Sequence, residues 1–425
     1  MKRLLSTLPG AEEAMQGEEY EKRVAAIAVE ITAGASAIEP TEFSAIDAEA
    51  EARFPGPIGL ADVLDFVDFA KIERRVAGHV LDFNRRYGLD EWDYAIAGAA
   101  GLFAAMLDLL CVRAPPKPTA AWTKQVDGTF NKAVQAAFNK LIPPELSATL
   151  SKANPIGAPD SSTVADLIGA PAKALNPINH RLRSLAHDPV LGFIFGVLDM
   201  KDGTCTTVVD GMFHRIPSTK GATEGSVFQL LGRMLGHLLS DVNAPTANGN
   251  RGMGLPAPFM GLLRMFEGIP VDGSTLGRQV EWMFANGYDF RQFTVSSVPM
   301  AIMEVLMRAF YVVKQMKLKD ADFGATVLET MPGRMHPRFR TMLALAYGTS
   351  SAVNAGKVCI TKNLLDANYA SWLGLVWNGF HAVKWALHDR PAQLWGELEA
   401  QEIAELQELV NELDVLKAKA AQLPT

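Results

Sequence analysis

The chain contains little cysteine and no excess of positive charge. Its three cysteines, Cys111, Cys205 and Cys359, lie far apart in 425 residues and form no CxxC pair. This spacing excludes a disulfide framework and favours a reducing compartment. The 40 basic residues are outnumbered by 47 acidic ones, which gives a net charge of −7. A chain without a basic excess is poorly suited to neutralise phosphates, so we expect no nucleic-acid partner.

Long hydrophobic runs and well-known catalytic motifs are also missing. The longest strongly apolar stretch, residues 94–107, is bounded by Asp93 and Asp108, and a membrane span needs about 20 residues. We therefore expect a buried core helix here and a cytoplasmic protein, with peripheral contact at the inner face of the membrane left open. The sequence has no GxxxxGK[ST] loop, Rossmann glycine pattern, HExxH or GxSxG, which argues against nucleotide-driven and serine-hydrolase chemistry.

Helical spacing of apolar residues dominates the sequence that remains. Positions three and four apart recur in residues 60–85, 226–241 and 299–316, while residues 205–213 are the best strand candidate. The pattern predicts an all-α, multi-helix bundle with at most one short hairpin. We expect an N-terminal helical region at 1–92, a helical core with a metal site at 93–390, and a separate C-terminal helix at 391–425.

The C-terminal segment is acidic and amphipathic. Its apolar positions follow a three-and-four spacing at Leu406, Leu409, Leu413 and Leu416, and glutamates fill the other faces. Such a helix either docks on its own domain or forms a homo-oligomer as a coiled coil. The spacing alone leaves both alternatives open.

Candidate metal ligands come first from the segment GRMLGHLLSDVNAP. His237 and Asp241 are four residues apart, so on a helix they share one face and can bind a common divalent ion. Gly232, Gly236 and Ser240 form a stripe of small residues that lets another helix approach closely. The alternative interpretation is a His–Asp hydrogen bond without metal.

A second histidine-containing segment spans residues 176–199. His180 and His187 are seven apart, which places them two turns apart on one face if the segment is helical. Asp188 followed by Pro189 is typical of an N-cap, with a new helix over 190–198. Arg181 and Arg183 either bind a phosphate or simply face solvent.

Asp108 ends an apolar helix that is rich in small residues. A carboxylate in such surroundings needs a partner or a cation, so Asp108 is a third candidate ligand. Asn354, Lys357 and Asn368 crowd a later polar segment, where they either line a pocket or cap helices.

These segments resemble, in part, the family of bacterial membrane-associated metal-dependent hydrolases, which is related in fold to zinc-dependent phospholipase C. The residues that match its HxxxD, HRGxTHS and PDxDH elements are, in that order, His237, Asp241 and Pro245; His180, Arg181 and His187; and Asp108. The chain departs from the family in its histidine spacing of seven instead of five, and in Asp188 where the family has Ser.

Together the residues and the resemblance predict a metal-dependent hydrolase that acts on an ester or phosphodiester, with a lipid as the implied substrate. The expected ligands of Zn²⁺ or another divalent ion are Asp108, His180, His187, His237 and Asp241. Arg181 and Asp188 are the expected catalytic residues, with Arg181 steadying anionic oxygens. The alternative is a non-catalytic helical interaction protein or a peripheral membrane effector.

Overall fold

The structure is a computed structural model. It describes residues 69–115, 128–154, 180–209, 211–218, 220–244, 254–271, 273–319 and 321–420. Most of the predicted N-terminal region and Pro245 lie outside these residues. The chain divides into two compact units: unit 1 holds residues 1–92, 335–341 and 379–425, and unit 2 holds residues 93–334 and 342–378.

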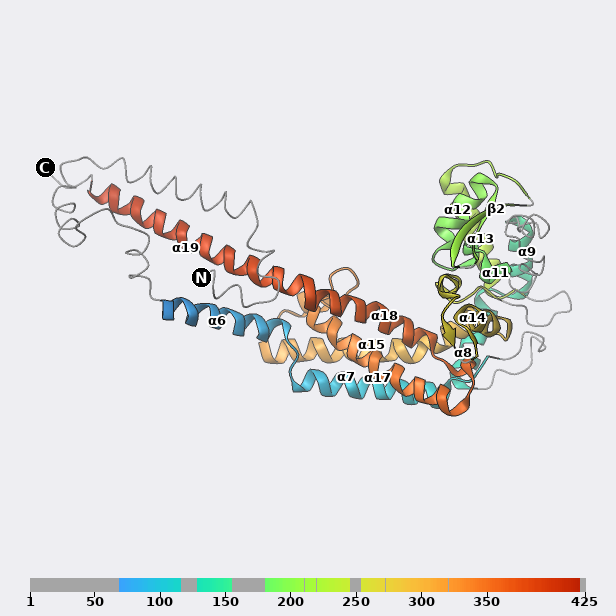
Figure 1. The fold of residues 1–425 in the computed structure, drawn as a ribbon, viewed down its shortest axis with the longest axis horizontal. Coiled ribbons are helices and arrows are strands. Elements are labelled where there is room, and N and C mark those ends of the chain that lie inside the picture. The colour runs from blue at the N-terminus through green and yellow to red at the C-terminus, as the bar shows by residue number, and fades with distance from the viewer. Residues whose placement is uncertain are drawn as a thin grey trace. The chain divides into compact units, whose positions relative to one another are not determined.

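Unit 1 is built around two helices that come from opposite ends of the chain. Helix α6 spans Phe69–Tyr87, and α19 spans Arg390–Ala420 after a π-helical turn at Trp385–Asp389. Arg86 donates to Glu397 over 2.5 Å, and Arg75 pairs with Glu405. The acidic C-terminal helix therefore docks on a helix of its own chain (Figure 1). Its self-association stays a prediction.

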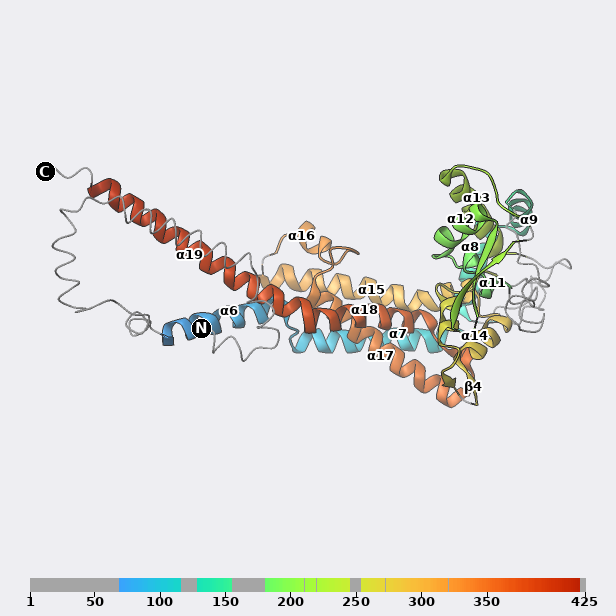
Figure 2. The same cartoon turned by 45° about the horizontal axis from the view of Figure 1, so that its top comes forward.

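Unit 2 contains most of a bundle of four helices that alternate in direction. They are α7 (Glu91–Cys111), α15 (Phe290–Lys319), α17 (Pro337–Thr361) and α18 (Tyr369–Lys384). The short helix α16 (Phe323–Leu328) lies in the connection between α15 and α17. Both views show the four long helices side by side, so segments distant in sequence share one bundle (Figures 1 and 2).

Small residues let the bundle helices approach closely. A Cβ atom built on Gly101 of α7 would collide with the carbonyl oxygen of Ala346 in α17, and one on Gly374 of α18 would collide with the ring of Tyr347. The hydroxyl groups of Ser351 and Ser371 hydrogen-bond over 2.9 Å between α17 and α18. Contacts made through small residues and hydroxyl groups are therefore a feature of this bundle.

The described residues between 128 and 289 of unit 2 form a second region, which we call the site region. Its helices are α8 (Thr129–Leu141), α9 (Pro144–Ala153), α11 (His180–Arg183), α12 (Gly192–Asp202), α13 (Val227–Val242) and α14 (Leu276–Ala285). Two 3₁₀ helices, Leu185–His187 and Met260–Phe266, connect them. Buried Val197, Leu230 and Met234 form the core between α12 and α13.

The prediction of a mostly helical fold is confirmed. The strand candidate is an antiparallel hairpin of β1 (Thr204–Val209) and β2 (Met212–Pro217), and a two-residue pair, β3 (Pro270–Val271) with β4 (Ser274–Thr275), was not foreseen. The helix expected at 190–198 begins at Gly192. The expected burial of residues 94–107 is wrong for one face of α7, where Leu102, Phe103 and Met106 are exposed.

Two helical stretches are long and apolar enough to cross a membrane by length and composition. They are Ile72–Cys111 and Phe290–Lys317, with mean hydropathies of 1.8 and 1.4 in their most apolar windows. Only 28% and 44% of these windows are buried inside the structure. Length and composition by themselves are weak evidence for a membrane span, so the expected cytoplasmic location stays a prediction.

Close packing of α7 against α17 makes Gly101 intolerant of a side chain. We expect Gly101→Ala to lower the free energy of unfolding by about 1–3 kcal/mol, because the new methyl group meets backbone and the Thr349 side chain. Gly98 lies on the same helix, and a methyl group added there would meet open space, so Gly98→Ala should be neutral or stabilise by up to about 1 kcal/mol. Thermal melts of the two variants check this, and equal shifts would contradict it.

Candidate metal centre

Helix α13 carries two of the predicted ligands in its last turns. Its start is set by a capping box in which Ser226 and Gln229 exchange hydrogen bonds between side chain and backbone. The helix then continues unbroken to Val242, so His237 and Asp241 stand one turn apart on its buried face. The His237 Nε2 atom lies 3.4 Å from the Asp241 Oδ2 atom.

Two of the three small residues predicted to admit a close neighbour, Gly236 and Ser240, receive helix α9 and the residue that follows it, whereas Gly232 is exposed. A Cβ atom on Gly236 would overlap the side chain of Asn154, and the Ser147 hydroxyl donates to the carbonyl oxygen of Ser240. This approach brings the Asn154 carbonyl oxygen within 3.0 Å of His237 Nδ1. Because a carbonyl oxygen can only accept, Nδ1 carries the proton and Nε2 presents a lone pair.

His187 reaches the same point from a different stretch of chain. It ends the 3₁₀ helix Leu185–His187, which is separated from α11 by extended backbone at Ser184, where a β-bridge forms to Thr207. His180 and His187 therefore do not lie on one helix. Their rings are nevertheless close, with centroids 5.4 Å apart in an edge-on arrangement.

Three ligand atoms converge where these segments meet. His237 Nε2 lies 3.2 Å from His187 Nε2, and Asp241 Oδ2 lies 3.8 Å from His187 Nε2. All three residues are buried, and Asp241 Oδ2 has no hydrogen-bond partner within the described part of the chain. A buried carboxylate oxygen facing two imidazole nitrogens is stable only when a proton or a cation lies between them.

Burial keeps both imidazoles in the form that binds a metal. Desolvation lowers the pKa of His187 well below its usual range, and the neighbouring His237, His180 and Arg181 lower it further. Desolvation also lowers the pKa of His237, against an opposing effect of the Asp241 carboxylate. Neutral imidazole is the ligand form of histidine.

The geometry fits a small divalent cation. Tetrahedral coordination with ligands at about 2.0–2.1 Å separates neighbouring ligand atoms by about 3.3–3.4 Å. The three measured separations, 3.2, 3.4 and 3.8 Å, lie around this value. Within the described residues, these are also the three side chains of ligand type whose atoms all lie within 4.8 Å of one another.

Arg181 borders this group and holds the carboxylate. Its Nη2 atom donates to Asp241 Oδ1 over 2.9 Å, which leaves Oδ2 directed at the two histidines. The Arg181 side chain keeps 21% of its surface exposed. Positive charge therefore lies between the buried ligand atoms and solvent.

Asp188 has both carboxylate oxygens occupied by backbone. Oδ1 accepts from the amides of Val190 and Leu191, each over 2.9 Å, and Oδ2 accepts from Phe259 over 2.6 Å. Phe259 has a φ of 61°, a strained value for a residue with a side chain. Burial raises the pKa of Asp188, against these three hydrogen bonds. The structure thus gives Asp188 a role in fixing the His187 turn.

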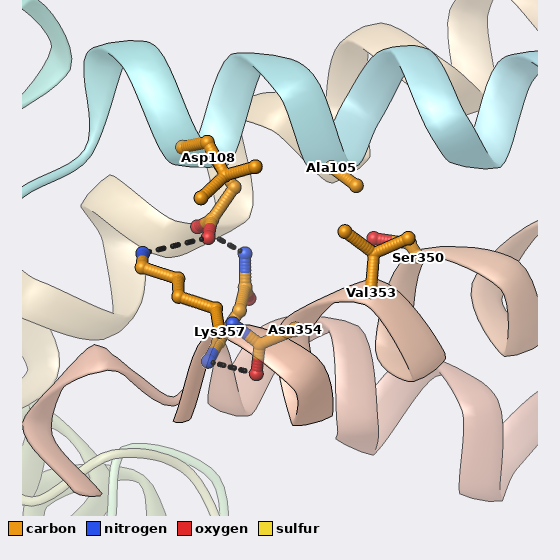
Figure 3. A pocket seen from close by; sticks show the side chains of 8 residues that line it. Ala105, Asp108, Ser350, Val353, Asn354 and Lys357 are labelled. Atoms are coloured by element: carbon orange, nitrogen blue, oxygen red, sulfur yellow. Dashed lines mark hydrogen bonds and ion pairs between the residues drawn. The ribbon is translucent and has the colours of Figure 1, made fainter. Parts of the chain in front are cut away.

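Asp108 is held elsewhere in unit 2, inside the helical bundle. Its carboxylate accepts from Lys357 Nζ over 3.0 Å and from the Asn368 amide over 2.8 Å (Figure 3). Asn354 and Ser350 line the same pocket. The structure therefore does not bring Asp108 to the His187, His237 and Asp241 group, because Asp108 already has a cationic partner.

Sequence reasoning did not identify Asn154, whose carbonyl oxygen orients His237. Backbone acceptors leave no trace in residue type, since every residue carries one. The one available signal was Gly236, which marks where another segment approaches α13. That signal indicates a neighbour but not which neighbour.

Removing the Asp188 carboxylate tests its structural role. We expect Asp188→Ala to lower the free energy of unfolding by about 1–3 kcal/mol, because three backbone amides lose their acceptor. Asp202→Ala is the matched control: it breaks an exposed ion pair with Arg215 and should cost about 0–1 kcal/mol. Denaturant titration compares the two, and an Asp188→Ala variant as stable as the control would refute the role.

Comparisons of this chain with protein families, with curated proteins and with solved structures find no match. What the protein does is therefore inferred from its own residues. The feature on which a functional proposal can rest is the convergence of His187, His237 and Asp241.

Proposed function

We propose that unit 2 binds a divalent cation through His187, His237 and Asp241. The observation that carries this proposal is the set of separations between their ligand atoms, 3.2, 3.4 and 3.8 Å. The donor set, two imidazoles and one carboxylate, suits Zn²⁺ and related borderline ions. The hydrogen bond from His237 Nδ1 to the Asn154 carbonyl oxygen is the outer contact that orients histidine ligands in metal sites.

The number of ligands favours a reactive site over a structural one. Structural zinc sites use four protein ligands, whereas catalytic sites use three and leave a position for water or substrate. His180 lies next to His187 but outside the group of three. We therefore infer that this site carries out hydrolysis of an ester or a phosphodiester, with a lipid as the substrate class that the sequence suggested.

Each residue around the site would have a separate role in hydrolysis. A divalent cation would supply Lewis acidity toward water and toward the oxygen under attack. Asp241 would hold the cation through Oδ2, while its Oδ1 stays bound to Arg181. The exposed part of the Arg181 guanidinium would steady the anionic oxygens of the substrate. Asp188 would position His187 and take no proton.

Metal binding by purified protein is the first test. We expect close to one equivalent of Zn²⁺ per chain, with affinity lowered at least about tenfold in His187→Ala and in His237→Ala, because each loses one of three ligands. Isothermal titration calorimetry and metal analysis measure this. His214→Ala is the matched control, since His214 lies on β2 and outside the group.

Fewer than about 0.3 equivalents in the unaltered protein would overturn the metal site. In that case the histidines share a proton through the 3.2 Å contact between their Nε2 atoms. Equal loss of affinity in His214→Ala would also count against the assignment, because a residue outside the site would then matter as much.

Hydrolysis is tested separately, with a phosphodiester such as bis(p-nitrophenyl) phosphate and with phospholipid vesicles. We expect turnover that a chelator abolishes and Zn²⁺ restores. Arg181→Ala should lower kcat/KM by about 10²-fold, as for removal of one donor to a developing oxyanion. Arg233→Ala, on the exposed face of α13, should leave it unchanged. Metal binding without any hydrolysis would refute the hydrolase and leave the metal site standing.

A further inference from the structure

Helix α7 of the bundle places large apolar side chains outside and small or polar ones inside, whereas α15 and α17 also bury large apolar residues such as Met303 and Leu343. On α7 the buried residues are Asp93, Ala97, Ala100, Gly101, Ala104, Ala105 and Asp108. The opposite face exposes Leu102, Phe103, Met106, Leu109 and Leu110. A helix at the surface of a water-soluble protein shows the reverse order, with its apolar stripe turned to the core.

Helix α18 repeats this inverted pattern. Its buried positions are Ala370, Ser371 and Asn378, while Val376 and Trp377 are exposed. On α15 the exposed positions include Val305, Leu306 and Val313. Exposed apolar side chains thus occur on α7, α15 and α18 of one bundle, and large exposed apolar patches mark interaction sites.

The interior of the bundle holds its charges in pairs. Lys314 of α15 donates to Asp93 of α7 over 2.7 Å, and both side chains are buried. Lys357 of α17 is paired with Asp108 of α7. Helices that meet in lipid face their ionisable residues inward, pair them, and pack through small residues. The contacts at Gly101, Gly374 and the Ser351–Ser371 pair follow that rule.

The lengths of three of the four bundle helices match the thickness of a bilayer. A hydrocarbon core of about 30 Å needs about 20 helical residues, and α7, α15 and α17 have 21, 30 and 25. Helix α18 has 16 residues and continues through the π-helical turn directly into α19. Pro299 within α15 is tolerated in membrane helices.

One end of the bundle has charge and aromatic residues suited to lipid headgroups. The pair of Lys314 with Asp93 brings the last turns of α15 to the first turn of α7. Lys317 follows in the same last turns of α15, and Tyr94 is exposed at the start of α7. Basic residues complement anionic lipids, and tyrosine favours the membrane interface.

We propose that the bundle of α7, α15, α17 and α18 spans a lipid bilayer, with its exposed apolar face in contact with acyl chains. The inference goes beyond the proposed function and does not depend on it, since no residue of the metal site takes part. Where the sequence analysis left peripheral membrane contact open, we infer an integral membrane protein. A second copy of the chain on this face is the outcome that would overturn it.

The test uses the full-length, unaltered chain expressed in bacteria. We expect the protein to float with membranes in a density gradient, which aggregates do not, and to stay with them through high salt and alkaline carbonate. Detergent alone should release it. Release by salt or carbonate would show peripheral binding. A soluble dimer without detergent would show that a second copy covers the face, and a soluble monomer would show that the face tolerates water. Each of these results overturns the proposal.

A charged residue on the apolar face gives a second measurement. We expect Leu102→Arg, at a side chain that is 55% exposed in mid-helix, to reduce the carbonate-resistant fraction about tenfold or more, because arginine on a lipid-facing position is costly. Phe228→Arg is the control, since Phe228 is 85% exposed on α13 of the site region. It should leave the fraction unchanged. Equal behaviour of the two variants, with the protein folded, would overturn the proposal.

Discussion

Two imidazole nitrogens and a carboxylate oxygen meet at one buried point of unit 2, and the proposed function depends on what lies between them. The His187 and His237 nitrogens are 3.2 Å apart, a separation that two lone pairs cannot hold without a proton or a cation. The contacts around these atoms also favour a cation at the centre. The Asn154 carbonyl oxygen sets the tautomer of His237, and Arg181 takes one oxygen of Asp241, leaving the other for the centre.

Buried carboxylates in the helical bundle also need a positive partner, and there the partner is a lysine instead of a metal ion. Asp93 and Asp108 are buried among small apolar residues, and each has a lysine as its partner. A buried carboxylate needs a positive charge nearby, and here the chain itself provides it. This explains why Asp108 belongs to the bundle although its surroundings in sequence fitted a metal ligand equally well.

Much of the local structure was predictable, because it depends on neighbours in sequence. The spacing of His237 and Asp241 correctly places both on one face of α13, and the hairpin falls on residues 205–213 as expected. The face of α7 was predicted wrongly. Periodicity shows which residues share a side of a helix, but Leu102 and Ala104 stand on different sides of an apolar helix, and hydrophobicity alone cannot say which side is covered.

The sequence by itself determined the helical class, the bounds of α13 within one residue, and the placement of His237 and Asp241 on one helix face, because each depends on contacts within a few residues of chain. Only the tertiary structure decided that His187 joins that pair while Asp108 turns to Lys357, and that α7 exposes its large apolar residues. These outcomes depend on contacts between segments tens to hundreds of residues apart. Their geometry follows from packing, since small residues such as Gly236 and Gly101 decide how closely two helices approach.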